Sequence, residues 1–242
     1  MKIFITDGSP AAFFSAVFDA FNLQNCKITS DKNLQLYLGN ELVNIVYDYG
    51  KCNRVRKGIE KYDKFAEDEI LLVLRSCDSQ KEQIAFNYIK KIIQKKSPVG
   101  KMMNLPEVIA FNDILYKVTG ETHRMKGFLR FTESSNGTLY APYSPDNDIT
   151  DLLVKHFSER LKSEKFLIHD IKRKIAGLYN GSECIMGNLD DAEIVLSDNE
   201  KAIENLWKKY YKSVNIKERP HEKQMKGYMP VRYWKFLPEK HI

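Results

Sequence analysis

The segment ETHRMKGFLRF (residues 121–131) carries cations and rings at a spacing that suits an anionic partner. Its second half, KGFLRF, alternates and predicts a strand, on which Lys126, Phe128 and Arg130 would share one face. Phosphates pair with such cations and a base can stack on the ring, each stack contributing about 1 to 3 kcal/mol. The segment therefore predicts a nucleic-acid-binding surface. The alternative is that another segment covers Phe128 while the two cations form a solvated rim.

Two histidines are candidates for acid–base chemistry. His123 and Arg124 end a predicted helix, where exposed carbonyls favour positive charge, so they either serve that helix end or flank an anionic ligand. His169 lies beside Asp170 on a predicted strand, and adjacent strand residues point to opposite faces, so these two do not orient each other. In an enzyme, Arg124 or Arg173 would neutralise phosphate charge.

A histidine-rich metal site is a further alternative. His156 could approach His169 or His123 in space, with Asp170 or Glu121 as a carboxylate ligand. No pair has HxxxH or HExxH spacing, the four cysteines form no CxxC pair, and GxGxxG, GxxxxGK[ST] and GxSxG are absent. We therefore expect no metal and no cofactor, and reduced thiols.

The densest basic run lies in the last segment, IKERPHEKQMKGYMPVRYWKFLPEK. If this segment contacts phosphates, it would make nucleic-acid binding strongly salt-dependent. The alternative is that it is an ordinary charge run, a solvated strap on the protein surface. The nucleic-acid-binding candidates in the whole chain are Arg124, Lys126, Phe128, Arg130, Arg173, Lys217, Arg219, Arg232, Tyr233 and Trp234.

The composition agrees with a polyanionic partner without requiring one. The 242 residues contain 38 Lys+Arg against 32 Asp+Glu, a net charge of +6, and 43% are hydrophobic, enough for a core without disulfides or metals. No apolar run approaches the roughly 20 residues of a membrane helix. The start, MKIFITDG, lacks the long apolar stretch of a signal peptide, so we expect a cytoplasmic protein with no membrane partner.

Hydrophobic periodicity predicts a mainly helical N-terminal part, residues 1–100, that begins with a strand. The strand at residues 2–6 is followed by a helix capped by Ser9 and Pro10, and a weaker strand follows near residues 27–29. Helical patterns continue over residues 52–62, 69–77 and 80–95. Pro98 and Gly100 in KKSPVGK predict an internal boundary near residue 100.

Residues 101–242 are predicted to contain the sheet, packed with the first part as one compact unit. A helix from about residue 105 to 124 precedes four period-2 segments, KGFLRF, TLYAPY, FLIHDIKR and IAGLYNG, with the helix DLLVKHFSERL between the second and third. This order predicts an α+β fold whose antiparallel sheet, a β-β-α-β-β core, is covered by helices. The helix EKAIENLWKKYYKS and a basic C-terminal strap complete the chain.

Four segments together carry a family resemblance: ETHRMKGFLRF, FLIHDIKRKIAGLYNG, LWKKYYKSVNIKER and MPVRYWKFLPE. In order and spacing they resemble the bacterial DNA metabolism protein family that carries a domain of unknown function. Members of that family are typically encoded beside a radical SAM protein of DNA repair or modification. In some bacteria the domain is joined to a uracil-DNA-glycosylase-like domain. The resemblance implies a role in DNA repair or modification, but it supplies no catalytic residues.

The leading hypothesis is a DNA-binding accessory protein of a radical SAM repair or modification system. Its partners would be DNA, the radical SAM protein and, by analogy with the fused members, a uracil-DNA-glycosylase-like protein. One alternative is an enzyme acting on nucleic acid or a nucleotide, with His123 and His169 as acid and base and Asp170 as a further catalytic candidate. The other is an interaction module that binds only the radical SAM protein.

Overall fold

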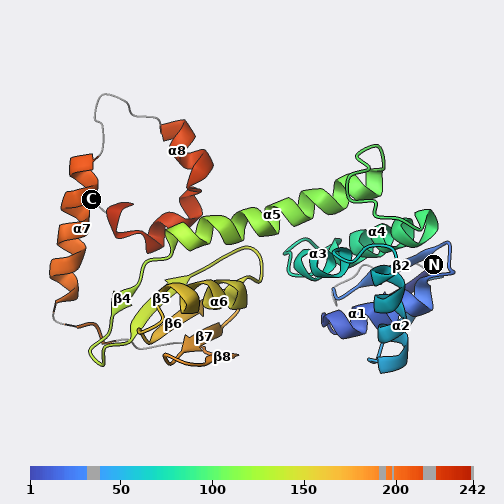
Figure 1. Ribbon diagram of the computed structural model, residues 1–242, viewed down its shortest axis with the longest axis horizontal. Helices are drawn as coiled ribbons and strands as arrows, with labels where there is room; N and C mark the ends of the chain where they lie inside the picture. The colour runs from blue at the N-terminus through green and yellow to red at the C-terminus, as the bar shows by residue number, and fades with distance from the viewer. Residues whose placement is uncertain (32–38, 191–194, 198, 215–221, 241–242) are drawn as a thin grey trace. The chain divides into compact units, whose positions relative to one another are not determined.

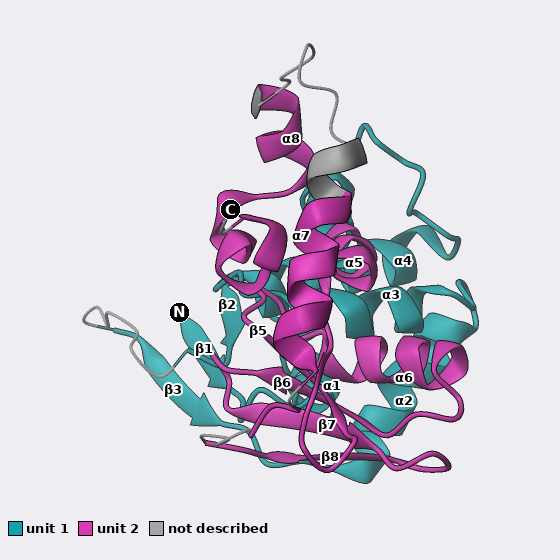
Figure 2. Ribbon diagram, turned by 90° about the vertical axis from the view of Figure 1, so that its left-hand side faces the viewer, with its two compact units in different colours: residues 1–119 teal, residues 120–242 magenta. Residues whose placement is uncertain are grey.

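The chain divides into two compact units, residues 1–119 and 120–242 (Figure 2). The computed structural model describes residues 1–31, 39–190, 195–197, 199–214 and 222–240, with the backbone alone for 211–214 and 222. The boundary falls inside helix α5 (Pro106–Phe128), later in the chain than the predicted boundary near residue 100.

The first unit is built on a short parallel sheet with the strand order β2-β1-β3 (Figure 2). Phe4 in the central strand pairs with Ile28 on one side and Val43 on the other, and Phe4 and Ile28 are buried. The first two strands confirm the sequence prediction, whereas the third was not predicted. The strands are β1 (Lys2–Ile5), β2 (Cys26–Thr29) and β3 (Glu41–Asn44).

Helix α1 (Pro10–Ala20) begins where its sequence predicts. The Ser9 hydroxyl accepts a hydrogen bond from the Ala12 N–H at 3.2 Å, and Pro10 occupies the first turn, where its missing N–H costs nothing. Phe13, Phe14 and Val17 are buried, as their helical spacing predicts, whereas Phe18, which was predicted on the same face, is 37% exposed. The described residues of the unit form three further helices before α5: α2 (Tyr49–Glu60), α3 (Ala66–Val73) and α4 (Lys81–Lys95).

The second unit contains a five-stranded mixed sheet with the order β4-β5-β6-β7-β8. Strands β5 and β6 are parallel and the other neighbours are antiparallel, so the prediction of an antiparallel sheet is wrong at the central pairing. Helix α6 (Thr150–Arg160) connects β5 to β6 and returns the chain to the same end of the sheet, which makes the two strands parallel. The strands are β4 (Thr132–Glu133), β5 (Leu139–Tyr143), β6 (Phe166–Asp170), β7 (Ile175–Tyr179) and β8 (Cys184–Asn188).

The predicted strand KGFLRF is wrong because α5 continues through Phe128. Glu121, Met125 and Leu129 are buried at intervals of four residues, the spacing of one helix face. The six-residue alternation is therefore the end of a longer helical stripe. Lys126, Phe128 and Arg130 do not share a strand face.

Helix α6 covers one face of the second sheet (Figure 1). A Cβ added to Gly177 of β7 would collide with Val154 of α6, so the two elements are in close contact. The opposite face is apolar rather than cationic, with Tyr140, Leu167, Leu178 and Ile185 in register across four strands.

The described part of the C-terminal segment is mostly helical. Helix α7 (Glu200–Val214) is followed by α8 (Glu222–Tyr228) and two 3₁₀ helices, η1 (Val231–Phe236) and η2 (Pro238–Lys240). The predicted binding residues Lys217 and Arg219 lie outside the described residues. Within the described part of the chain, no helix combines the length and apolar character needed to cross a membrane.

Candidate nucleic-acid interface

The second half of α5 presents a buried side and a cationic side. Glu121 and Met125 are 1% and 2% exposed, whereas His123 is exposed and Lys126 is half-buried. His123 and Lys126 are three residues apart and are therefore neighbours on the helix surface. Arg124 lies on another side, with Nη1 3.4 Å from the position that a Cβ on Gly120 would take.

Lys126 lies close enough to α6 to act on its histidine. Burial lowers the pKa of His156, and the positive charges of Lys126 and Arg160 lower it further, against an opposing effect of Glu159. Cations from two helices, α5 and α6, therefore act on the same imidazole. We call this group the α5–α6 cation surface: His123, Lys126, His156 and Arg160.

The cations of this surface are not neutralised by ion pairs within the described structure. Neither Lys126 nor Arg160 has a carboxylate within salt-bridge distance among the residues that the structure describes. Arg160 is exposed in the last turn of α6, where backbone carbonyls favour a cation for structural reasons alone. The arrangement can attract phosphate groups without first breaking an internal pair.

Arg130, in contrast, is held inside the protein. Its Nη2 lies 2.6 Å from Glu239 Oε1, its Nη1 donates to the Gly127 carbonyl at 2.8 Å, and its guanidinium lies 5.3 Å from the Trp207 ring centre. Burial acts to raise the pKa of Glu239, but hydrogen bonds from Arg130, the backbone and Trp207 outweigh it and hold the pKa below its usual value. Arg130 is therefore engaged in an internal ion pair.

Asp170 and Arg173 also serve the fold where the structure places them. Asp170 is fully buried at the end of β6, and its Oδ1 accepts the N–H groups of Lys172 at 3.0 Å and Arg173 at 3.2 Å. The Arg173 guanidinium donates to Asp170 Oδ2 at 2.8 Å and to the carbonyl oxygens of Pro145 and Asp146. The pair fixes the β6–β7 turn against the loop that follows β5.

Glu121 organises the same loop from the helix side. Its carboxylate accepts the N–H groups of Asp146 at 2.9 Å and Asn147 at 2.8 Å, the Asn147 side-chain amide and the Tyr233 hydroxyl. Arg232 bonds Asp146 Oδ2 at 2.7 Å and lies over the Tyr233 ring at 4.6 Å. Burial and the bond to Glu121 raise the Tyr233 pKa, so its hydroxyl stays a proton donor.

His169 is not available as a general base. It is 3% exposed, and its Nε2 lies 3.1 Å from the Leu189 carbonyl while its Nδ1 lies 2.9 Å from the Tyr140 hydroxyl. A carbonyl only accepts, so Nε2 donates to Leu189, and Nδ1 shares the second hydrogen bond with the Tyr140 hydroxyl. Both nitrogens are thus occupied inside the protein, whereas His123 is exposed on α5.

The remaining predicted rings are partly covered. Phe128 is half-buried, 6.5 Å from the centre of the Tyr233 ring, and Trp234 donates its N–H to the Met229 carbonyl at 3.0 Å under the Lys240 ammonium. Across the residues described, no three His, Cys, Asp or Glu side chains are grouped so that they could hold a metal ion.

The sequence interpretation missed the central role of Glu121 and the contribution of Arg160. Glu121 could have been found, because it is a carboxylate at a position where the apolar helical stripe requires a buried side chain. Such a residue must bring its own hydrogen-bond partners into the core. Arg160 gives no such signal, since its relation to Lys126 depends on how two helices pack.

Residues 79–239 match the family model of a domain of unknown function, DUF4130. The chain belongs to this family. The match covers the α5–α6 cation surface and the buried network around Glu121. No curated protein and no solved structure matches the chain.

Proposed function

We propose that the protein binds nucleic acid through the α5–α6 cation surface and acts as a DNA-binding accessory protein. The observation that supports this most directly is that Lys126 and Arg160, on separate helices, have no ion-pair partner among the residues described, while both charges lower the pKa of His156. Of the predicted binding residues, Lys126 belongs to this surface, and Arg124 lies on the same helix. The family resemblance adds a radical SAM protein as the partner that would perform the chemistry, with a uracil-DNA-glycosylase-like protein as a further partner.

Fluorescence anisotropy with labelled single-stranded, duplex and uracil-containing DNA tests the proposal. Lys126→Glu combined with Arg160→Glu should weaken binding more than about tenfold, because two phosphate contacts become repulsive. Arg160→Glu also removes a favourable charge from the end of α6, and this should lower the melting temperature of the double variant by only about 4 °C or less. If three phosphates are contacted on duplex DNA, raising the salt from about 50 to about 200 mM should weaken wild-type binding roughly 40-fold.

The matched control changes the net charge equally but elsewhere. Lys64→Glu with Lys101→Glu reverses two exposed cations of the first unit. If binding depends on a local surface, this control should retain affinity within about twofold at moderate salt. Equal losses in both double variants, or no binding of any DNA at low salt, would remove the proposal.

A protein-interaction module is the second candidate function, and a feature of α7 favours it. Ile203, Leu206 and Tyr210 lie on one helix face and are 50%, 64% and 56% exposed. The occupant that the family resemblance suggests is the radical SAM protein. Co-purification of the two proteins after nuclease treatment, combined with no DNA binding by this protein alone, would favour this function over the first.

The enzyme alternative receives no comparable support. His169 is buried in the sheet and both of its ring nitrogens make hydrogen bonds, so it does not pair with His123 as acid and base. A nucleic-acid reaction in this system is therefore assigned to a partner protein.

A further inference from the structure

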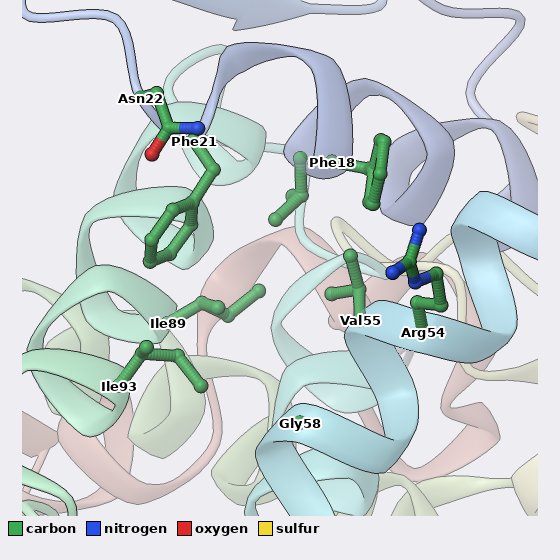
Figure 3. Close-up of a pocket in the computed structure, with 9 residues that line it drawn as sticks. Phe18, Phe21, Asn22, Arg54, Val55, Gly58, Ile89 and Ile93 are labelled. Atoms are coloured by element: carbon green, nitrogen blue, oxygen red, sulfur yellow. The ribbon is translucent and has the colours of Figure 1, made fainter.

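The first unit contains an apolar pocket, distant in sequence from the cation surface, between the end of α1 and helices α2 and α4 (Figure 3). Its volume is about 370 Å³, within the range of sites that bind small molecules. The pocket is lined by Val17, Phe18, Phe21, Asn22, Arg54, Val55, Gly58, Ile89 and Ile93.

The lining combines a buried apolar floor with two aromatic side chains. Val17 and Ile89 are 0% and 1% exposed, whereas Phe18 is 37% exposed and Phe21 is half-buried. Figure 3 shows Asn22 and Arg54 on opposite sides of the apolar side chains. A flat apolar group would gain from burial against this floor and from contact with the rings.

Arg54 gives the pocket its charge. Its guanidinium lies 5.6 Å from the Phe18 ring centre, and in the described parts of the chain no carboxylate pairs with it. Asp19, the residue after Phe18, pairs with Lys51 at 2.7 Å, and Lys51 lies one turn before Arg54 on α2. The pocket is therefore complementary to an anion, and a planar carboxylate matches the fork of the guanidinium.

Gly58 leaves room that packing does not require. It lies near the end of α2, where a glycine is less favourable than alanine. An added Cβ would meet only Ile93 Cδ1, at an ordinary contact distance of 3.7 Å. Neither backbone conformation nor crowding explains the glycine, and its missing side chain enlarges the pocket.

From these observations we propose that the pocket binds a small aromatic carboxylate. The ring system would lie among Phe18, Phe21 and the aliphatic floor, and the carboxylate would bond to Arg54. This ligand site is independent of the nucleic-acid surface.

Isothermal titration calorimetry of the full chain with 2-naphthoate, and with the neutral 2-naphthamide, tests the proposal. We expect 2-naphthoate to bind with a Kd below about 1 mM and the amide to bind about tenfold more weakly, because it lacks the charge-assisted bond. Arg54→Gln should remove the difference between the two compounds. Lys57→Gln, an exposed cation on the same helix but outside the lining, should preserve it.

A pocket-filling variant separates this site from other apolar surfaces. Gly58→Leu should abolish binding of both compounds without lowering the melting temperature, since leucine favours the helix. If this variant does not fold, Gly58→Ala adds a single carbon and should weaken binding measurably. Failure of wild type to bind 2-naphthoate below about 1 mM, or unchanged binding when the folded Gly58 variant is tested, would overturn the proposal.

Discussion

The Arg130–Glu239 ion pair makes one of the predicted DNA-binding cations unavailable to a ligand. The Glu239 side chain is 1% exposed and that of Arg130 is 25% exposed. The buried carboxylate has almost no contact with water, and the positive charge of Arg130 compensates for this loss. The Trp207 N–H is its other side-chain partner, at 2.9 Å. Reversing the charge at Arg130 would disturb the fold, so a loss of DNA binding in such a variant would not identify a contact.

Arg130→Gln should lower the free energy of unfolding by about 2 kcal/mol, because it leaves a buried carboxylate without its counter-charge. Chemical denaturation measures this change. The double variant Arg130→Gln with Glu239→Gln should recover part of the loss, since no unpaired charge is then buried. A single-variant effect below about 0.5 kcal/mol would mean that the pair contributes little.

His156 provides a pH-dependent contribution to stability with a definite sign. Burial and neighbouring cations lower its pKa in the folded state, so the unfolded chain binds a proton more readily. The favourable contribution is present above the unfolded-state pKa of about 6.5 and is lost as the pH falls through the lower, folded-state value.

We therefore expect His156→Gln to reduce the pH dependence of stability between about pH 7.5 and pH 5.5. Wild type should lose more stability than the variant over this interval, in denaturant titrations at matched salt. Lys155→Gln, an exposed change one residue earlier, should leave the pH profile unchanged. A variant profile parallel to that of wild type would contradict the expected role of the imidazole.

At the scale of elements, the contact between α6 and the sheet depends on Gly177. The neighbours of this position are Ile168 and Met186 in the sheet and Val154 on the helix. An added Cβ would lie 2.9 Å from Met186 Sδ and would collide with Val154. The small residue lets α6 approach β7 closely.

Gly177→Ala should therefore destabilise the protein by about 1 to 3 kcal/mol through overpacking. Combining it with Val154→Ala should cost less than the sum of the two single changes, because the removed methyl groups make room for the new one. Urea denaturation of the four variants gives the coupling energy. Strict additivity would mean that α6 moves away instead of clashing.

The helices and strands differ in how far the sequence predicts them. Local patterns predicted β1, α1, α4, β5, α6, β6 and β7, because each depends on the periodicity of its own side chains. Strand β8 was missed because CIMGN is exposed throughout and therefore lacks the alternation of apolar and polar positions that marks a half-buried strand. The helix between β5 and β6 could have indicated their parallel pairing, since parallel neighbours require such a crossover.

At the scale of the whole molecule, the net charge of +6 gives no information about where free cations lie. Arg130, Arg173 and Arg232 contact carboxylates, whereas Lys126 and Arg160 have no such contact among the residues described. Pairing depends on residues far apart in the chain, such as Arg130 and Glu239, and only the folded structure brings these together. The candidate surface was therefore only partly predictable from the sequence.

The anchoring of α5 by Glu121 limits how the chain can be dissected. The boundary after Thr119 lies inside the helix, two residues before Glu121, whose carboxylate accepts hydrogen bonds from Asp146 and Asn147 in the loop between β5 and α6. A fragment that began at residue 120 would place this carboxylate at a frayed end, where a helix keeps few of its own hydrogen bonds. A shortened protein that retains the second unit should thus begin no later than Pro106, so that it keeps the whole of α5 together with the loop that Glu121 binds.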